Sequence, residues 1–306
     1  MNTLDTCIYL YNLLGNKKGV HPYFLTPLRR CVRYYANSHI SKYIENIPKS
    51  LSKNQSDIII SLTSFPKRID HIHLVIQCML IQSILPKKII LWLSKEQFNG
   101  IELPENLTKL ENHIFEIRLV EGDLRSHKKY FYALSEYPDS KILLIDDDIY
   151  YPTDMIEQMI EASEKYPDTV ICRYGSIMKF KHGKLLPYND WWDEISSECN
   201  NQNFFFGSGG GTLIKREWLF KDALDMELAT KLTPLADDVW LNAMVNLQGT
   251  PKHKIKFGLI LPIKIENNQK LSTENVDQDQ NTIQIKNITD YYNKRWGLNP
   301  FAEQNL

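Results

Sequence analysis

Three consecutive aspartates, Asp146, Asp147 and Asp148, follow the apolar run Lys141-Ile-Leu-Leu-Ile and precede Ile-Tyr-Tyr-Pro. A short run of β-branched and aliphatic residues predicts a buried strand, and Pro152 marks where regular pairing has ended. The acids are therefore expected at the carboxyl end of a strand, the edge at which open α/β sheets bind ligands. Adjacent carboxylates repel one another and are costly to bury unless a cation or a donor-rich ligand neutralises them. A hard divalent ion together with a phosphate suits such a cluster.

Strand and helix patterns alternate along the chain, which predicts an α/β fold with a largely parallel sheet. Apolar runs predict strands over 57–64, 88–93 and 115–120, and helical spacing predicts helices over 69–84 and 128–136. The later predicted elements are strand 141–145, helix 153–165, strands 169–173 and 177–181, helix 237–247 and strand 255–263.

The chain of 306 residues is 43% hydrophobic and 24% charged, as in an ordinary globular protein. We expect three parts: a basic, aromatic and helical N-terminal extension (1–53), one catalytic α/β domain (54–265) and a C-terminal tail with a short helix (266–306). The odd number of cysteines, five, shows no metal-binding spacing and indicates reduced thiols. Because no apolar stretch approaches about 18 residues, we expect a cytoplasmic protein, neither secreted nor transmembrane.

The N-terminal segment 1–53 differs in charge from the rest of the chain. It holds eight basic and two acidic residues, a balance of +6 in a chain whose net charge is −1. Two interpretations fit this composition. The segment could lie on an anionic membrane surface, at the inner face of the cell membrane, where each cation adds about 1 kcal/mol. Alternatively, it packs on the catalytic domain with a solvated basic face.

The acidic triplet resembles the DxD signature of glycosyltransferases with the GT-A fold, a Rossmann-like nucleotide-diphospho-sugar transferase fold. Within that group the chain is most similar to bacterial capsule and surface-polysaccharide transferases. The resemblance also rests on Ser61-Leu-Thr-Ser-Phe-Pro-Lys-Arg68, on His127-Lys-Lys-Tyr130 and on Ala236-Asp-Asp-Val-Trp240, and it covers roughly residues 57 to 265. It implies a mixed, mostly parallel sheet flanked by helices.

The resemblance assigns metal binding to Asp148, with Asp146 as a second ligand of Mn²⁺ or Mg²⁺. Asp146 or Asp147 would fix the ribose of the nucleotide. A bound metal would stabilise the leaving diphosphate by Lewis-acid action. The alternative for any one of these acids is a cap on the turn before helix 153–165.

Two basic segments are candidate nucleotide contacts. Thr63, Ser64 and Arg68 follow the first strand, and hydroxyls with a guanidinium suit a base and a phosphate. Lys128 and Lys129 precede the acidic strand, and in the resembling family one such lysine reaches the nucleotide. A solvated turn and an exposed lysine face are the corresponding structural interpretations.

Asp237 and Asp238 are expected to open a helix, where carboxylates are favoured by free amides and the macrodipole. One acid suffices as a cap. In similar transferases an acid here faces the acceptor hydroxyl, so Asp238, with Asp237 as second choice, is the candidate general base. Because the same run also resembles a motif of retaining, exostosin-like transferases, the stereochemical outcome stays open.

Glycine-rich and aromatic segments give weaker signals. Gly209 and Gly210, within Phe206-Gly-Ser-Gly-Gly-Gly211, would let backbone approach a donor sugar, unless this is simply a flexible turn. Trp191 and Trp192 suit either a sugar platform or the core. His253 is expected to be a surface residue rather than a metal ligand.

These patterns together predict a metal-dependent hexosyltransferase that uses a UDP-linked sugar. The expected acceptor is a saccharide or lipid-linked saccharide in capsule, lipooligosaccharide or O-antigen synthesis, and no nucleic acid is involved. A phosphohydrolase with Asp146 as nucleophile is disfavoured because Tyr150 replaces the threonine of its pattern. A non-catalytic nucleotide-sugar scaffold is disfavoured because it needs no cluster of repelling carboxylates.

Overall fold

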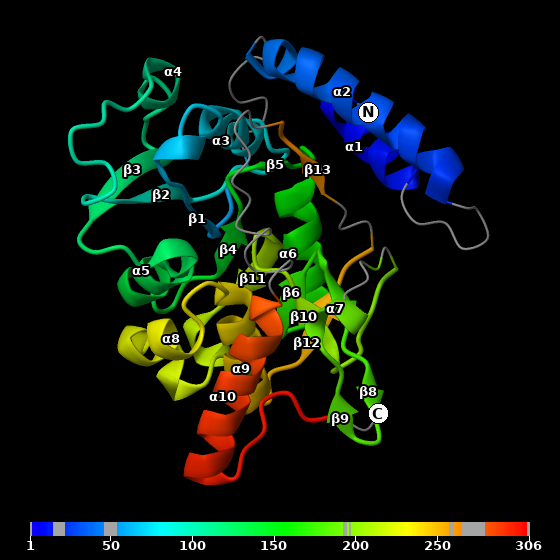
Figure 1. The fold of residues 1–306 in the computed structure, drawn as a ribbon. Helices are drawn as coiled ribbons and strands as arrows, with labels where there is room; N and C mark the ends of the chain where they lie inside the picture. The colour runs from blue at the N-terminus through cyan, green and yellow to red at the C-terminus, as the bar shows by residue number, and fades with distance from the viewer. Residues whose placement is uncertain are drawn as a thin grey trace.

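The computed structural model describes residues 2–14, 22–45, 54–191, 195, 197–256, 260–264 and 279–304. A seven-stranded sheet forms the centre of the fold (Figure 1), in the order β12-β6-β11-β4-β1-β2-β3. β11 runs antiparallel to both of its neighbours, and the other pairings of these seven strands are parallel. The expected α/β class, with a mixed and mostly parallel sheet, is therefore confirmed. The strands are β1 (Ile59–Thr63), β2 (Lys88–Ser94), β3 (Phe115–Val120), β4 (Ile142–Ile145), β6 (Val170–Cys172), β11 (Gly210–Ile214) and β12 (Lys252–Lys254).

The strand order places a topological switch point at the carboxyl ends of β1 and β4, where open α/β sheets form a ligand crevice, and we call this the crevice edge of the sheet. From β1 the chain adds β2 and β3 on one side and then returns to pair β4 with the other side of β1. The connections leaving β1 and β4 therefore diverge, which is the arrangement that creates ligand sites in open α/β sheets. The segments after Thr63 and after Ile145 border this crevice.

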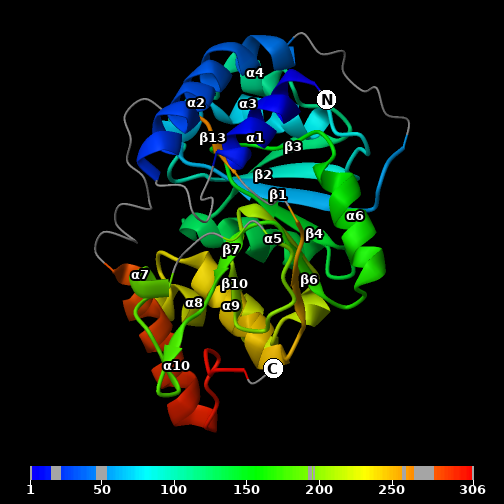
Figure 2. The same ribbon diagram turned by 90° about the vertical axis from the view of Figure 1, so that its right-hand side faces the viewer.

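Helices cover both faces of the sheet. Alternate residues of β1 point to opposite faces and pack against these two layers. Ile60 and Leu62 pack in one apolar cluster with α3 (Ile72–Leu80) and α6 (Met155–Lys165). Ile59 packs in the cluster of the other face. Figure 2 shows the two helical layers on either side of the strands. The second layer contains α5 (Lys128–Glu136), α8 (Met226–Leu232), α9 (Asp237–Gln248) and α10 (Gln280–Trp296).

The N-terminal helices α1 (Thr3–Leu13) and α2 (Pro22–Glu45) lie against the α3 side of the molecule (Figure 1). Leu4 and Ile40 are fully buried in the same apolar cluster as α3. The Asp5 carboxylate accepts hydrogen bonds from the amide and hydroxyl of Thr153 at 2.8 and 2.6 Å. The described helical part of the extension is thus packed on the domain. Within the described residues, no helix is long and apolar enough to cross a membrane.

Smaller elements complete the described part of the fold. Three two-stranded sheets pair β5 with β13, β7 with β10 and β8 with β9. Their bounds are β5 (Ile149–Tyr150), β7 (Gly175–Ile177), β8 (Phe180–Lys181), β9 (Lys184–Leu185), β10 (Phe204–Phe206) and β13 (Leu261–Pro262); the short helices are α4 (Glu105–Thr108), α7 (Tyr188–Trp191), η1 (Pro66–Arg68), η2 (Arg125–His127), η3 (Arg216–Trp218) and η4 (Lys221–Leu224).

The last strand of the main sheet lies earlier than the sequence pattern predicts. It is Lys252–Lys254, whereas the predicted span 255–263 contains only the two paired residues of β13 among those described. The apolar-run criterion misses β12 because its lysines are buried: Lys252 Nζ donates to Asn246 Oδ1 at 2.8 Å.

The C-terminal helix α10 is 17 residues long and contributes Ile288 and Tyr292 to the core beside α9. The preceding stretch 265–278 lies outside the described residues. The three-part domain division therefore stays a prediction.

Candidate functional site

The acidic triplet begins directly after β4, at the crevice edge of the sheet. The side chains of Asp146 and Asp148 are 42% and 31% exposed, whereas that of Asp147 is 7% exposed. Asp148 lies immediately before β5, and its carbonyl oxygen accepts a 2.8 Å hydrogen bond from the Ile263 amide. The carboxylates of Asp146 and Asp148 are thus accessible to solvent, whereas that of Asp147 is buried.

Asp147 and Asp148 are tied to the segment that leaves β1. Ser64 Oγ donates to Asp147 Oδ2 at 2.6 Å. Arg68 Nη1 lies 2.6 Å from Asp147 Oδ1 and 3.1 Å from Asp148 Oδ2. Arg68 belongs to the short helix η1, which begins at Pro66 where the fixed proline φ suits a first helical residue. The guanidinium therefore joins the ends of β1 and β4 across the crevice.

Lys129, in the first turn of α5, joins Asp146 to the start of α9. Its Nζ donates to Asp146 Oδ1 at 2.9 Å and lies 3.0 Å from Asp237 Oδ2. Ser208 completes this half of the site: its hydroxyl donates to Asp237 at 2.6 Å and its amide to Asp238 at 2.7 Å. The two acids at the head of α9 are thus held by different groups.

Gly209 touches the acidic triplet through its backbone. A Cβ at this position would lie 1.7 Å from Asp146 Cγ, so a larger residue would fit only if the Asp146 side chain moved. The Gly209 carbonyl accepts hydrogen bonds from the Asp146 amide at 3.0 Å and from the Tyr151 hydroxyl. The glycine loop and the triplet therefore form one packed unit.

The charges of this cluster are unevenly compensated. Although the Asp148 side chain is 31% exposed, desolvation by the surrounding protein and the charge of Asp147 raise its pKa to about 7, because they outweigh the attraction of Arg68. Burial and Asp237 likewise raise the pKa of Asp238 to about 7. Each of these two carboxylates titrates near neutral pH and gains from any added positive charge.

Lys129 and Asp237 form a buried ion pair within the site. Burial opposes the charged form of Lys129, but Asp146, Asp237 and Asp238 together raise the pKa of its ammonium group. Burial also opposes ionisation of Asp237, but the charge of Lys129, with further help from the Ser208 hydroxyl, holds its pKa below the usual range. Both groups are therefore charged at neutral pH.

The donor set is chemically suited to a divalent cation. Asp146 and Asp148 are accessible carboxylates, and Mg²⁺ sites commonly use one or two carboxylates plus substrate phosphates. Across the described residues, no group of three or more histidine, cysteine or acidic side chains forms a ready-made metal cage. A cation held by Asp146 and Asp148 would complete its coordination with water or substrate oxygens.

Three residues that the sequence singles out lie apart from the cluster. Thr63 Oγ1 donates to the Trp92 carbonyl at 2.7 Å, within the sheet. Lys128 Nζ donates to Asp123 at 2.6 Å, on another side of α5 from Lys129. A Cβ on Gly210 would meet Tyr174 rather than an acid.

The aromatic and histidine candidates also lie elsewhere. Trp191 is 1% exposed in the core, with its indole nitrogen donating to the Leu186 carbonyl at 2.9 Å, which favours the core interpretation. Trp192 lies outside the described residues. His253 stacks on Tyr166 and is buried, not exposed as expected, and it lies 3.3 Å from Glu198.

Two functional contacts were missed by sequence reasoning. Ser208 lies inside the glycine run and binds both acids of α9. Tyr151 reaches back to the triplet, where its hydroxyl accepts from the Asp146 amide at 2.8 Å. The contact of Ser208 had a signal in the sequence, a serine flanked by glycines ahead of a pair of acids. The contact of Tyr151 had none, because nothing in the sequence distinguishes Tyr151 from the adjacent Tyr150.

Comparison with known proteins gives structural likeness only. No family model matches the chain, and no curated protein matches it. A mannosyltransferase from Pyrobaculum calidifontis, solved with GDP-Man and Mn²⁺, is similar with a TM-score of 0.45 and 9% identity over 96% of this chain and 78% of that one. S. aureus TarS, solved with UDP, gives a TM-score of 0.41 and 8% identity over 79% and 72%.

A third similar structure is the 4-diphosphocytidyl-2C-methyl-D-erythritol synthase from Anaerococcus prevotii, with a TM-score of 0.43 and 13% identity over 72% and 97%. At such identities, none of these likenesses assigns a substrate or an activity to this chain.

Proposed function

We propose that this protein is a metal-dependent glycosyltransferase of the GT-A type that moves a hexose from a nucleotide diphosphate sugar, a UDP-sugar, to a saccharide acceptor in surface-glycan synthesis. One observation carries the proposal: among the described residues, Arg68 and Lys129 are the only lysine or arginine side chains within ion-pair distance of a cluster of five carboxylates, those of Asp146 to Asp148 and of Asp237 and Asp238. Three formal negative charges are uncompensated there. A divalent cation with a diphosphate balances such a cluster.

Asp146 and Asp148 would hold the cation, Mn²⁺ or Mg²⁺. When bound, the ion would supply Lewis-acid stabilisation of the charge that develops on the leaving diphosphate. Asp147 is committed to Ser64 and Arg68, so its role is to fix the turn that presents the other two acids. Arg68 and Lys129 lie within ion-pair distance of these acids and would also contact the phosphates of the donor, or the carboxylate that binds its ribose.

Asp238 is the candidate general base. Its pKa of about 7 lies near the working pH, where a base combines a useful ionised fraction with a useful proton affinity. Asp237 is unsuitable because Lys129 and Ser208 keep its carboxylate engaged and ionised. Asp238 would take the proton of the acceptor hydroxyl as the new glycosidic bond forms.

A second candidate is a nucleotide-sugar binder without turnover. The favouring observation is the contact of Arg68 with both Asp147 and Asp148, which already brings one positive charge to the triplet. In that case the ligand would bind through Arg68 and Lys129 with no metal dependence. Manganese dependence of binding separates the two candidates.

We also propose that the outer face of α2 contacts the anionic inner surface of the cell membrane. Leu28, Tyr34 and Tyr35 are 54, 75 and 49% exposed on this helix. Its described side chains, residues 25–44, include Arg30, Arg33 and Lys42 and no acid, whereas Arg29 packs over the Tyr11 ring of α1. An apolar face with basic neighbours suits an anionic lipid surface, and the protein would be cytoplasmic and peripheral, near lipid-linked acceptors.

The Asp148→Asn variant tests the proposed function, with Asp154→Asn, an exposed acid of the following turn, as matched control. Melting temperature is measured with UDP-glucose and GDP-mannose, each with and without Mn²⁺. A ligand at about 100 times its Kd stabilises the native protein by about 2.7 kcal/mol. We expect the nucleotide sugar with Mn²⁺ to raise the melting temperature of the native protein and of the control. In Asp148→Asn we expect both this stabilisation and the sugar-transfer activity to be lost. Full transfer activity of a folded Asp148→Asn variant would reject the metal role.

A further inference from the structure

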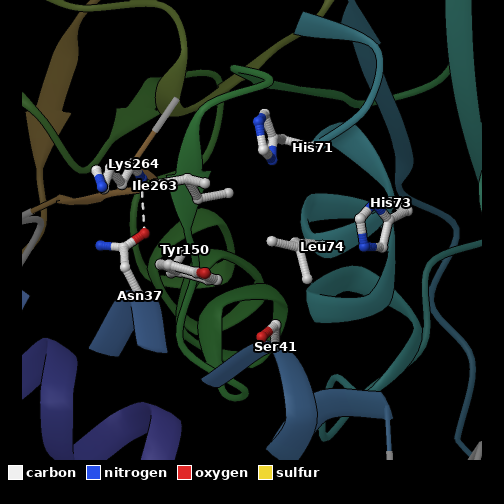
Figure 3. A pocket seen from close by; sticks show the side chains of 8 residues that line it. All are labelled: Asn37, Ser41, His71, His73, Leu74, Tyr150, Ile263 and Lys264. Carbon is white, nitrogen blue, oxygen red and sulfur yellow. Dashed lines mark hydrogen bonds between the residues drawn. The ribbon is translucent and has the colours of Figure 1, made fainter. Parts of the chain in front are cut away.

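A cleft of about 310 Å³ lies between α2 and the start of α3. Figure 3 shows Tyr150 and Leu74 facing each other across it, with His71 at one end and Ser41 at the other. Its volume falls at the lower end of the range for small-molecule sites. The lining includes Ser41 from α2, His71 and His73 at the start of α3, Tyr150 of β5, and Ile263 and Lys264 after β13.

Several polar groups of this cleft have no partner within the described part of the chain. Tyr150 is 1% exposed, and no described residue hydrogen-bonds to its hydroxyl. The His71 ring and the Ser41 hydroxyl likewise lack a described hydrogen-bond partner. The Tyr150 hydroxyl is therefore available to donate a hydrogen bond to a ligand in the cleft.

The polarity of the lining favours an anion. No lining residue is acidic, while His71, His73 and Lys264 are basic or protonatable. α3 begins at Ile72, next to His71, and its N-terminal end adds positive electrostatic potential from the helix dipole. Hydroxyl donors, imidazoles and a helix N-terminus together are typical of a phosphate site.

The cleft adjoins the acidic cluster through two short connections. Tyr150 follows Asp148 by two residues, and Ile263 binds the Asp148 carbonyl while also lining the cleft. On the other wall, His71 follows Arg68, the partner of Asp147 and Asp148, by three residues. A molecule held in the cleft would therefore lie beside the proposed transfer site.

We propose that this cleft binds the phosphate group of a phosphorylated acceptor, with donors from Ser41, His71 and Tyr150. This inference rests on the proposed glycosyltransferase function and names the acceptor class. α2 supplies one wall of the cleft and also the exposed apolar face described above, so an acceptor with a lipid tail fits both surfaces. A soluble phosphate ester would use the cleft alone.

The test measures binding of farnesyl phosphate, farnesol and inorganic phosphate by titration calorimetry. The variant is Tyr150→Phe with His71→Gln, which removes donors while keeping size. Its matched control is Tyr291→Phe with His113→Gln, on α10 and before β3. We expect farnesyl phosphate to bind the native protein and the control, and to bind the cleft variant at least tenfold more weakly. Binding of UDP-glucose with Mn²⁺ should be equal in all three proteins.

The outcomes separate the two proposals. Tighter binding of farnesyl phosphate than of inorganic phosphate supports a lipid-linked source, and equal binding supports a phosphate site for soluble esters. Farnesol binding as tightly as farnesyl phosphate, or unchanged affinity in the cleft variant, overturns the inference. UDP-glucose binding without any phosphate-ester binding overturns the inference and leaves the proposed function intact. Phosphate-ester binding without UDP-glucose binding rejects the acceptor role.

Discussion

Asp238 is ionised only at a cost, because burial and Asp237 raise its pKa to about 7. Its folded pKa thus exceeds the unfolded value of about 3.9. The native state is favoured while this carboxyl is protonated, so the contribution is fully present below about pH 4 and is lost as pH rises toward 7.

Asp238→Asn should remove this pH dependence. We expect the variant to gain stability over the native protein as pH rises from 4 to 8, reaching on the order of 2 kcal/mol above pH 7, while transfer activity falls. Urea denaturation across this range measures the effect. A constant difference at all pH values would contradict the raised pKa.

Gly209 is predicted to be intolerant of any side chain. Gly209→Ala should cost roughly 1–3 kcal/mol through overpacking and should weaken nucleotide-sugar binding more than tenfold, because the added Cβ would displace Asp146. The double variant with Asp146→Ala provides the control. In a double-mutant cycle measured by urea denaturation, the clash should be relieved and the two costs should not add; simple additivity would show that Asp146 is not the group displaced.

At the scale of elements, helices present adjacent residues in different directions, and this decides which lysine enters the site. Successive residues of α5 differ by about 100°, so Lys129 reaches Asp146 and Asp237 while Lys128 reaches Asp123. Similarly, α2 turns Ile40 into the core and Tyr34 and Tyr35 outward. One helix therefore offers both a packing face and a surface for a partner.

The exposed face of α2 gives a prediction for lipid binding. Replacing Tyr34 and Tyr35 together by serine should weaken binding to vesicles of phosphatidylcholine with phosphatidylglycerol at least tenfold, because apolar contact with the interface is lost. Sedimentation with the vesicles measures it, and added salt should weaken binding of the native protein. Leu119→Ser, at a 51% exposed position of β3, is the control. Equal loss in both would assign the effect to general surface hydrophobicity.

At the scale of the whole molecule, the two apolar clusters extend beyond the expected catalytic domain. α1 and α2 contribute to the cluster that contains α3, and α10 contributes to the opposite one. We therefore expect the N-terminal helices to unfold together with the sheet rather than as a separate unit.

Ile40→Ala tests this unity, since Ile40 is fully buried on α2. The substitution should lower the stability of one cooperative transition by about 2–5 kcal/mol, whereas Leu28→Ala, at a 54% exposed position of the same helix, should change it by less than about 0.5 kcal/mol. Calorimetry and near-UV circular dichroism follow the transition. A separate early transition that alone responds to Ile40→Ala would make the extension independent.

The sequence by itself determined the α/β class and the location of the acids at a strand's carboxyl end. Both follow from local patterns: the apolar run before Asp146 specifies a buried strand, and alternating helix and strand periods specify parallel pairing. The sequence also determined that a helix begins at Asp237 and Asp238, because carboxylates are favoured in the first turn of a helix.

Tertiary structure alone decided which side chains share the site. Arg68 contacts Asp147, and Ser208 contacts Asp237, across long stretches of chain. The cleft between α2 and α3 likewise joins Ser41, Tyr150 and Lys264. No local period encodes such contacts, because they depend on how helices and strands pack after they form. The raised pKa of Asp148 is of the same kind: it arises from burial and neighbouring charge, which exist only once the chain has folded.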